Sequence, residues 1–248
     1  MDLSIIIPAY NEERNLPVLL GEIHQALGPL GKEYEVLVVD DGSTDGTLEV
    51  LRGLAADDPR LRVLHLAHNS GQSAAFDAGF RHARAPVLAT VDADLQNDPA
   101  DLPRLLAKLD EGWDVVSGIR ADRQDSWVRR VSSKIANGIR NRLTHASVTD
   151  VGCTLRVVRK EVADRIVLFT GLHRFLPTLL EMAGARGTEI PVHHRPRLYG
   201  EPKYNIRNRI WKALVDLFAV RWMQRRWIDR EQVEEISTPA APNERPHP

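Results

Sequence analysis

Residues 34–47 read YEVLVVDDGSTDGT, so that an apolar run of strand length leads directly into two aspartates, a glycine and small polar residues. Aspartate and glycine after such a run are typical of a strand that ends in a turn. The same order occurs at LSIIIPAYNE (3–12) and at APVLATVDAD (85–94). The sequence therefore predicts several strands, each followed by a polar turn.

Helix-length stretches separate these apolar runs. We expect strands at 3–7, 34–39, 61–66, 85–91 and 113–118, and helices at about 12–27, 44–56, 72–84 and 99–111. Ser43 or Asp45 can cap the second of these helices, and Asp98 can cap the fourth. This alternation predicts an α/β fold with a mostly parallel sheet and helices on both faces.

The second half of the chain is more helical. Trp127, Val131 and Ile135 begin a four-residue spacing that predicts an amphipathic basic helix from Ser126. We expect helices near 159–167 and 175–185, a short strand around 189–194, and a last helix at about 204–227. The sequence predicts a domain at 1–206, an amphipathic basic helix at 207–230 and, because proline and polar residues dominate there, a disordered tail at 231–248.

Charge is divided unevenly along the chain. Residues 1–116 carry 9 basic and 20 acidic side chains, whereas residues 117–230 carry 23 basic and 10 acidic ones. An acidic half suits a divalent cation and a basic half suits phosphate, although two solvated faces of opposite charge would give the same counts. The single cysteine, Cys153, and an N-terminus unlike a signal peptide favour the cytoplasm.

Carboxylates follow three of the predicted strands. Glu12 follows the first, Asp40 and Asp41 the second, and Asp92 and Asp94 the fourth. Ligands of open parallel sheets bind beyond these carboxyl ends, where clustered carboxylates need a cation or hydrogen-bond donors. For Asp40 and Asp41 a turn and helix cap would be a purely structural explanation. A phosphoacceptor receiver domain also has paired aspartates, but it would leave the basic region unexplained.

Five motifs, taken in order, resemble the inverting family 2 glycosyltransferases with a GT-A fold: PAYNE, VVDDGSTDGT, NSGQSAAFDAG, DADLQNDP and DVVSGIR. Later stretches, including DVGCTLRVVRKEV and EIPVHHRPRLYGEPKY, resemble the dolichyl-phosphate mannose synthases and bacterial polyprenyl-phosphate transferases of that family. The resemblance covers about residues 3–225. It implies transfer of a sugar from a nucleotide-diphosphate donor (UDP- or GDP-sugar) to a polyprenyl phosphate, undecaprenyl or dolichyl.

The resemblance also implies roles for individual residues. The expected donor contacts are Pro8, Tyr10, Glu12, Val39, Asp41, Asp92, Ala93, Arg197 and Lys203. Asp94 and Gln96 match the side-chain ligands of Mg²⁺ or Mn²⁺, and Arg120, Arg129 and Ser133 match positions that hold the acceptor phosphate. Asp94 and Arg120 are the expected catalytic residues. Asp150, Gly152 and Arg156 match another family element, in which Arg156 is either part of a structural ion pair or a wall of the acceptor site.

Other functions remain open at this stage. If the acceptor were a glycan or small-molecule hydroxyl, Asp94 or Asp92 would be the candidate general base. A catalytically degenerate nucleotide-sugar-binding protein is the alternative from another class. A processive synthase is disfavoured because QRRW at 224–227 is one residue short of its signature, and nucleic-acid binding because stacking aromatics are sparse in the basic region.

Many relatives carry transmembrane helices after this domain, but no stretch here has the roughly 20 consecutive apolar residues of a span. The stretch 207–228 combines Trp211, Trp222 and Trp227 with arginines at both ends. It therefore suits either a helix in a membrane interface or one that packs on its own domain. The expected location is the cytoplasmic face of the membrane, and a small membrane protein or a second copy is a further candidate partner.

Overall fold

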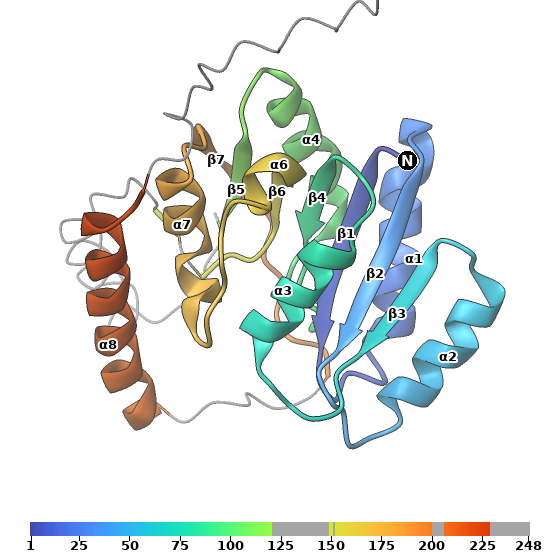
Figure 1. Ribbon diagram of the computed structural model, residues 1–248. Helices are drawn as coiled ribbons and strands as arrows, with labels where there is room; N and C mark the ends of the chain where they lie inside the picture. Colours follow the sequence, from blue (N-terminus) through green and yellow to red (C-terminus); the bar gives the residue numbers. More distant parts are fainter. Residues whose placement is uncertain (121–148, 151, 200–205, 229–248) are drawn as a thin grey trace, which may run out of the picture.

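The computed structural model describes residues 1–120, 149–150, 152–199 and 206–228, with side chains left out at 206–213. Seven strands form one sheet in the order β3-β2-β1-β4-β6-β5-β7 (Figure 1). They are β1 (Leu3–Ala9), β2 (Tyr34–Asp40), β3 (Leu61–His65), β4 (Val87–Thr90), β5 (Val115–Arg120), β6 (Arg156–Arg159) and β7 (Gly187–Val192). All neighbouring strands are parallel except β6, which is antiparallel to β4 and β5. The predicted mostly parallel α/β sheet is confirmed.

Helices cover both faces of the sheet. The α-helices are α1 (Leu16–Leu27), α2 (Thr47–Asp57), α3 (Gln72–His82), α4 (Leu102–Asp110), α6 (Lys160–Ala163), α7 (Leu176–Met182) and α8 (Ile206–Arg225). Three 3₁₀ turns accompany them: η1 (Gly28–Leu30), η2 (Pro99–Asp101) and η3 (Leu172–Phe175). None of the helices in the described residues is both long and apolar enough to cross a bilayer.

Alternation along the strands divides the core into two layers. In β1, Ile5 and Ile7 pack with the leucines of α1 and α4, while Ile6 packs on the opposite face. Successive side chains of a strand point to opposite faces, which is why one apolar run supplies both layers. The second layer joins α3, α6, α7 and α8, and α8 enters it through Leu217 and Val220.

The structure differs most from the sequence prediction at β6. The sequence pattern predicts no strand at 156–159 and a helix from about 159, but Val157 and Val158 are fully buried in a strand between β4 and β5. The helix there is only α6, four residues long. The run RVVR is short and has an arginine at each end, so its apolar signal is weak.

Two helices begin later than expected. Residues 12–15 form a turn, and α1 begins at Leu16 rather than at Glu12. Likewise α2 begins at Thr47, and Ser43 is not its cap, because the Ser43 hydroxyl accepts a hydrogen bond from the Asn11 amide instead. Asp98 does cap η2, where its carboxylate accepts from the amide of Ala100.

Candidate active site

The carboxyl ends of β2, β1 and β4 lie next to one another in the sheet. The amide of Val91 donates to Ile6 and extends the β4 pairing by one residue, so that Asp92 emerges beside the end of β1. On the other side of β1, the amide of Asp41 donates to the carbonyl of Ala9. The three predicted strand ends therefore form one rim, and Asp41 and Asp92 leave the sheet on either side of β1.

Asp40 and Asp41 have different surroundings. Asp40 is fully buried, and its carboxylate lies 2.7 Å from His65 Nδ1 and 3.2 Å from the amide of Ser43. Asp41 instead accepts from the amides of Ser70 and Gly71, at 2.7 and 2.8 Å. Asp40 thus stabilises the turn, whereas Asp41 fixes the loop that leads into α3.

Gly42 makes this turn possible. Its φ of +67° lies in the left-handed region, and a Cβ there would come within 2.5 Å of the main chain of His68. Only glycine allows the two loops after β2 and β3 to approach so closely.

The loop after β1 is bound to the loop after β2. Asn11, at φ +54°, accepts from the amide of Thr44 at 2.8 Å, and the amide of Glu12 donates to the Thr47 hydroxyl at 2.8 Å. Among the other predicted donor residues, Pro8 and Tyr10 are partly exposed here. The side chain of Val39 is fully buried in the core and does not line the rim.

Asp92 is held on three sides. Its carboxylate accepts from Gln72 Nε2 at 2.8 Å and from the hydroxyl of Thr154, and its amide donates to Asn97 Oδ1 at 3.1 Å. Burial, and then the neighbouring charge of Asp94, raises the pKa of Asp92 to about 7. An ionised Asp92 is therefore destabilised at this place, as expected where a cation would relieve the repulsion.

Asp94 lies opposite a cation supplied by the chain itself. Arg197 Nη2 is 2.6 Å from Asp94 Oδ2, while Asp94 Oδ1 accepts from the amide of Gln96. Leu95, between them, is buried at φ +61°, a conformation that costs energy for a bulky side chain. Such strain is often found at functional sites. Here the main chain turns at the buried Leu95, between Asp94 and Gln96. Ala93, which was expected at the donor diphosphate, is also buried.

The segment after β7 brings Arg197 to the rim. The carboxylate of Glu22 accepts two hydrogen bonds from Arg195, at 2.9 and 2.6 Å, and Arg195 also donates to the carbonyl of Asn97. The amide of His193 donates to Asp101 at 2.6 Å. These contacts fix the segment against α1, η2 and the loop after β4, which explains how Arg197 reaches Asp94, 103 positions away in the chain.

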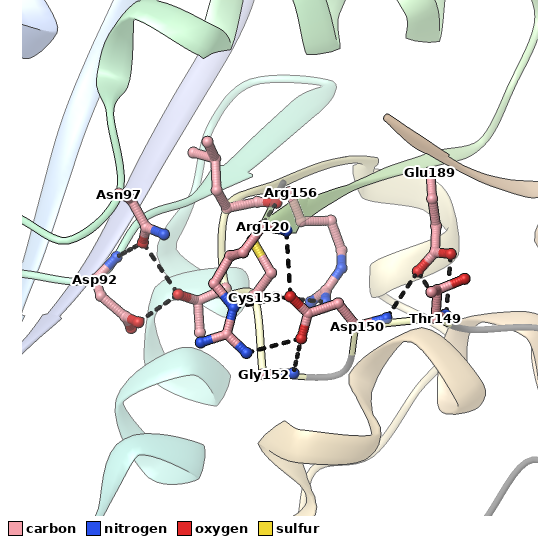
Figure 2. Close-up of polar contacts among 11 residues, drawn as sticks. Asp92, Asn97, Arg120, Thr149, Asp150, Gly152, Cys153, Arg156 and Glu189 are labelled. Carbon is pink, nitrogen blue, oxygen red and sulfur yellow. Dashed lines mark hydrogen bonds and ion pairs between the residues drawn. The ribbon is translucent and has the colours of Figure 1, made fainter. Parts of the chain in front are cut away.

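A second polar network lies beside the first. Figure 2 shows Arg120 and Asp150 facing each other, with Arg120 Nε and Nη2 each 2.8 Å from one carboxylate oxygen. Gly152 leaves room for this pair, since a Cβ there would lie 2.5 Å from Arg120 Nη2. Glu189 accepts from the amides of Thr149 and Asp150. The predicted acceptor residue Arg120 is thus already paired with a carboxylate.

The hydroxyl of Thr154 contacts both Asp92 and Asn97 and so belongs to the first network. Arg156 is only 2% exposed, yet its hydrogen bonds go to the neutral Ser117 hydroxyl and the Cys153 carbonyl. Burial lowers the pKa of Arg156 to about 10 and raises that of the Cys153 thiol to about 11. Arg156 therefore has a buried structural position but forms no close ion pair among the described residues.

Some predictions concern other parts of the chain. Arg129, Ser133, Lys203, the helix expected from Ser126 and the tail at 231–248 lie outside the described residues.

The residues that hold Asp41 and Asp92 in place were not among the predicted site residues. They are Ser70, Gly71, Gln72, Asn97 and Thr154. The motif NSGQS at 69–73 was the only signal for the first three.

Comparison with solved structures shows the same fold. A mannosyltransferase from Pyrobaculum calidifontis, in complex with GDP-Man and Mn²⁺, is 25% identical with a TM-score of 0.64; the match covers 88% of this chain and 63% of that one. Glucosyl-3-phosphoglycerate synthase from Mycobacterium tuberculosis, with Mn²⁺, UDP and phosphoglyceric acid, is 18% identical with a TM-score of 0.67, covering 92% and 79%. TarS 1–349 from S. aureus, with UDP-GlcNAc, is 20% identical with a TM-score of 0.62, covering 90% and 67%.

A family model gives the more specific finding. The model described as glycosyl transferase family 2 matches residues 4–167, which include the rim aspartates and the segment 149–156. Because the matched residues make up more than half of this chain, the chain belongs to glycosyl transferase family 2.

Proposed function

We propose that this chain transfers a glycosyl group from a nucleotide-diphosphate sugar to a polyprenyl phosphate at the cytoplasmic face of the membrane, with inversion and with Mg²⁺ or Mn²⁺. The observation that carries the proposal is the rim of polar residues at the carboxyl ends of β2, β1 and β4. It runs from Asp41 through the loop at 70–72 to Asp92, and on to Asp94 and Arg197. Carboxylates and a cation meet there at the carboxyl ends of a parallel sheet, where ligands of such folds bind.

The nucleoside fits the Asp41 end of the rim. The Asp41 carboxylate uses one lone pair on each oxygen for the amides of Ser70 and Gly71, and each oxygen keeps another. It can therefore accept from a base imide or a ribose hydroxyl while it holds the loop. Tyr10, partly exposed after β1, can stack on a base. The GDP-Man and UDP complexes of the solved relatives support a donor of this class.

The residues at the other end fit a hard divalent cation. Asp94 and Gln96 offer oxygen ligands, and the described residues hold no group of three His, Cys, Asp or Glu side chains placed to bind a metal, either at this rim or elsewhere. Mg²⁺ commonly takes one or two protein carboxylates and completes its shell with phosphate and water, so a small ligand set is sufficient. When bound, the cation would neutralise charge that develops on the leaving diphosphate. Mn²⁺ and Mg²⁺ in relatives of the same fold support this assignment.

The reaction is an in-line displacement at the anomeric carbon. An oxygen of the acceptor phosphate forms the new bond to that carbon, while the bond to the diphosphate oxygen breaks and its electron pair leaves with the nucleotide. A phosphate monoester has a second pKa of about 6, so at neutral pH it is a nucleophile that needs no strong base. Arg197 would stabilise the leaving group, and basic side chains between 120 and 134 would offset the repulsion between the two phosphorylated reactants.

A second acceptor class has specific support. The M. tuberculosis relative is a glucosyl-3-phosphoglycerate synthase whose structure contains phosphoglyceric acid. A small phosphorylated acid is therefore the main competitor of the prenyl phosphate, and both would require cationic side chains at the acceptor site. The basic excess of residues 117–230 favours a phosphorylated acceptor of either kind over a simple hydroxyl.

The test separates the acceptor from the donor. Purified full-length chain is incubated with labelled nucleotide sugars, Mn²⁺, and either undecaprenyl phosphate or phosphoglycerate, and the products are partitioned between organic and aqueous phases. We expect label in the organic phase only with the prenyl phosphate. If the label instead enters a water-soluble product made from phosphoglycerate, phosphoglycerate replaces the prenyl phosphate as the acceptor. If no donor supports any transfer, a binding protein with a degenerate site is favoured.

A variant then tests the acceptor residues. Arg129→Ala should reduce transfer to the acceptor at least tenfold and leave nucleotide binding, measured by thermal shift, within about twofold. Arg52→Ala, on the exposed side of α2, is the matched control and should change neither. An equal loss of both readouts in the Arg129 variant would contradict its assignment to the acceptor.

A further inference from the structure

Helix α8 is apolar on two opposite sides, and the fold uses only one of them. Leu217 and Val220 are buried in the core layer formed by α3, α6 and α7. Leu214, Phe218 and Trp222, spaced four residues apart, lie on the opposite side together with Val215, and these four side chains are 40% to 66% exposed. Residues at this spacing share one helix face. The apolar residues of α8 therefore form two separate stripes, one buried and one exposed.

This exposed stripe is unusual on the described surface. Six of the twelve large apolar side chains that the described residues expose lie between Leu214 and Ile228, and two of these, Trp227 and Ile228, follow the end of the helix. Isolated apolar residues on a surface need no explanation, but a contiguous group marks an interaction site. Figure 1 shows α8 at the edge of the molecule, with α7 on its inner side.

The charges around the stripe are almost all basic. Between 206 and 228 the chain carries six basic residues and one acidic residue, Asp216. Arg225 and Arg226 are exposed in the last turn, and the guanidinium of Arg226 lies 5.5 Å from the centre of the Trp222 ring. Basic residues also occur at the start of the helix, at 207, 209 and 212. The sequence is therefore basic on both sides of residues 214–222.

This charge distribution selects the partner. If two copies of the chain paired through α8, either orientation of the helices would bring basic ends together, and like charges oppose such pairing. An anionic lipid surface complements both ends at once and accepts the apolar stripe between its head groups and acyl chains. Tryptophan and arginine next to one another suit the depth of the head groups, where an apolar ring and a charged group are both accommodated.

We propose that the outer stripe of α8 (Leu214, Val215, Phe218 and Trp222, with Arg225 and Arg226) is a docking surface for an anionic lipid bilayer. The helix lies along the bilayer surface, held to the protein by Leu217 and Val220. The inference rests on the exposed stripe and its charges rather than on the identity of the acceptor. It deepens the proposed function, on whose membrane location it rests, by naming the surface that docks, and it leaves the acceptor open because a membrane-docked transferase could still act on a water-soluble acceptor.

The experiment uses the full chain and two kinds of vesicle. Phosphatidylcholine vesicles, with and without phosphatidylglycerol, are sedimented with the protein, and the bound fraction is measured over a range of salt concentrations. We expect binding to the anionic vesicles, weakened by salt. The double variant F218S/W222S should bind at least tenfold less, and R225Q/R226Q about fivefold less for each arginine removed. Val18→Ser and Arg52→Gln, both exposed on other helices, should bind like the wild type.

Three controls keep the test decisive. Thermal unfolding and nucleotide binding of each variant show that the fold and the donor site are intact, so that loss of vesicle binding is distinct from failure of the transferase proposal. Absence of wild-type binding to anionic vesicles would overturn the inference. So would a concentration-dependent dimer, measured by sedimentation equilibrium without lipid, that F218S/W222S converts to monomer, because the stripe would then be covered by a second copy.

Discussion

Replacing Arg197 by glutamine removes the cation that lies 2.6 Å from Asp94 in the structure. A divalent ion bound to Asp94 has to displace this guanidinium or tolerate its positive charge nearby. Arg197 has the opposite effect on the donor diphosphate. Once it has left Asp94, its guanidinium can donate hydrogen bonds to the phosphate oxygens and so favour nucleotide binding. The substitution should therefore change metal affinity and nucleotide affinity in opposite directions.

The size of each effect can be estimated from exposure. The side chains of Arg197 and Asp94 are 26% and 14% exposed, so solvent screens part of their attraction, and about 1 kcal/mol is reasonable for the pair. Its removal should raise the affinity for Mn²⁺ alone about fivefold. A charge-assisted hydrogen bond to phosphate contributes about 1.5–3 kcal/mol, so nucleotide affinity at saturating Mn²⁺ should fall between about tenfold and a hundredfold.

Two titrations measure these changes. Electron paramagnetic resonance of free Mn²⁺ gives the metal affinity without nucleotide, and calorimetry gives the affinity for nucleoside diphosphate with Mn²⁺ present. Arg104→Gln is the matched control. Arg104 Nη1 lies 2.8 Å from Asp101 Oδ1, and neither residue of this ion pair is a candidate metal ligand. If Arg197→Gln weakened Mn²⁺ binding, or if both affinities stayed unchanged, the idea that arginine and metal compete for Asp94 would be wrong.

Three further predictions concern the same rim and the core. Asp94→Asn should reduce metal-dependent transfer at least a hundredfold, and full activity of the wild type in a chelator would refute the metal role. The pKa of Asp92, raised to about 7 from 3.8, means that the folded metal-free protein binds this proton more tightly than the unfolded chain, so stability should fall as the pH rises from about 4 to about 7. Denaturant titrations across that range should show a smaller fall for Asp92→Asn, and an unchanged curve would contradict the shift. Gly79→Ala should cost about 1–3 kcal/mol of unfolding free energy in the same titrations, because its Cβ would lie 2.3 Å from Ile6 Cγ2; a neutral result would show that the contact relaxes.

The sheet was predictable because its signals are local. The apolar runs at 3–7, 34–39 and 85–91 are each followed directly by a proline or an aspartate, and parallel strands place these ends at one edge. That pattern was sufficient to predict Asp41 and Asp92 at one rim, whereas their placement on either side of β1 comes from the strand order in the structure. It failed at β6, since Val157 and Val158 become a central strand only when β4 and β5 provide both neighbours. The sequence pattern contains no sign of those neighbours.

The candidate site shows the same limit more strongly. Asp92 was visible in the sequence as part of an Asp-x-Asp motif, but its partner Thr154 is 62 positions away, in the stretch DVGCTLRVVRKEV, where the resemblance gave Thr154 no role. Resemblance assigned Arg120 to the acceptor phosphate, whereas the structure pairs it with Asp150. Such pairings depend on which loops the fold brings together, and spacing along the chain does not encode them directly.

These long-range contacts have a common electrostatic consequence. The rim contains Asp92 and Asp94 at close range, and among the described residues their charge is offset only in part, by Arg197 at contact distance and the buried Arg156 farther away. A donor diphosphate alone would add negative charge to this rim, and a divalent cation alone would compete with Arg197. Bound together, they add little net charge, and Arg197 can move from carboxylate to phosphate without leaving an unpaired cation. The geometry at Asp94 therefore favours joint binding of metal and donor, which is the state from which transfer has to begin.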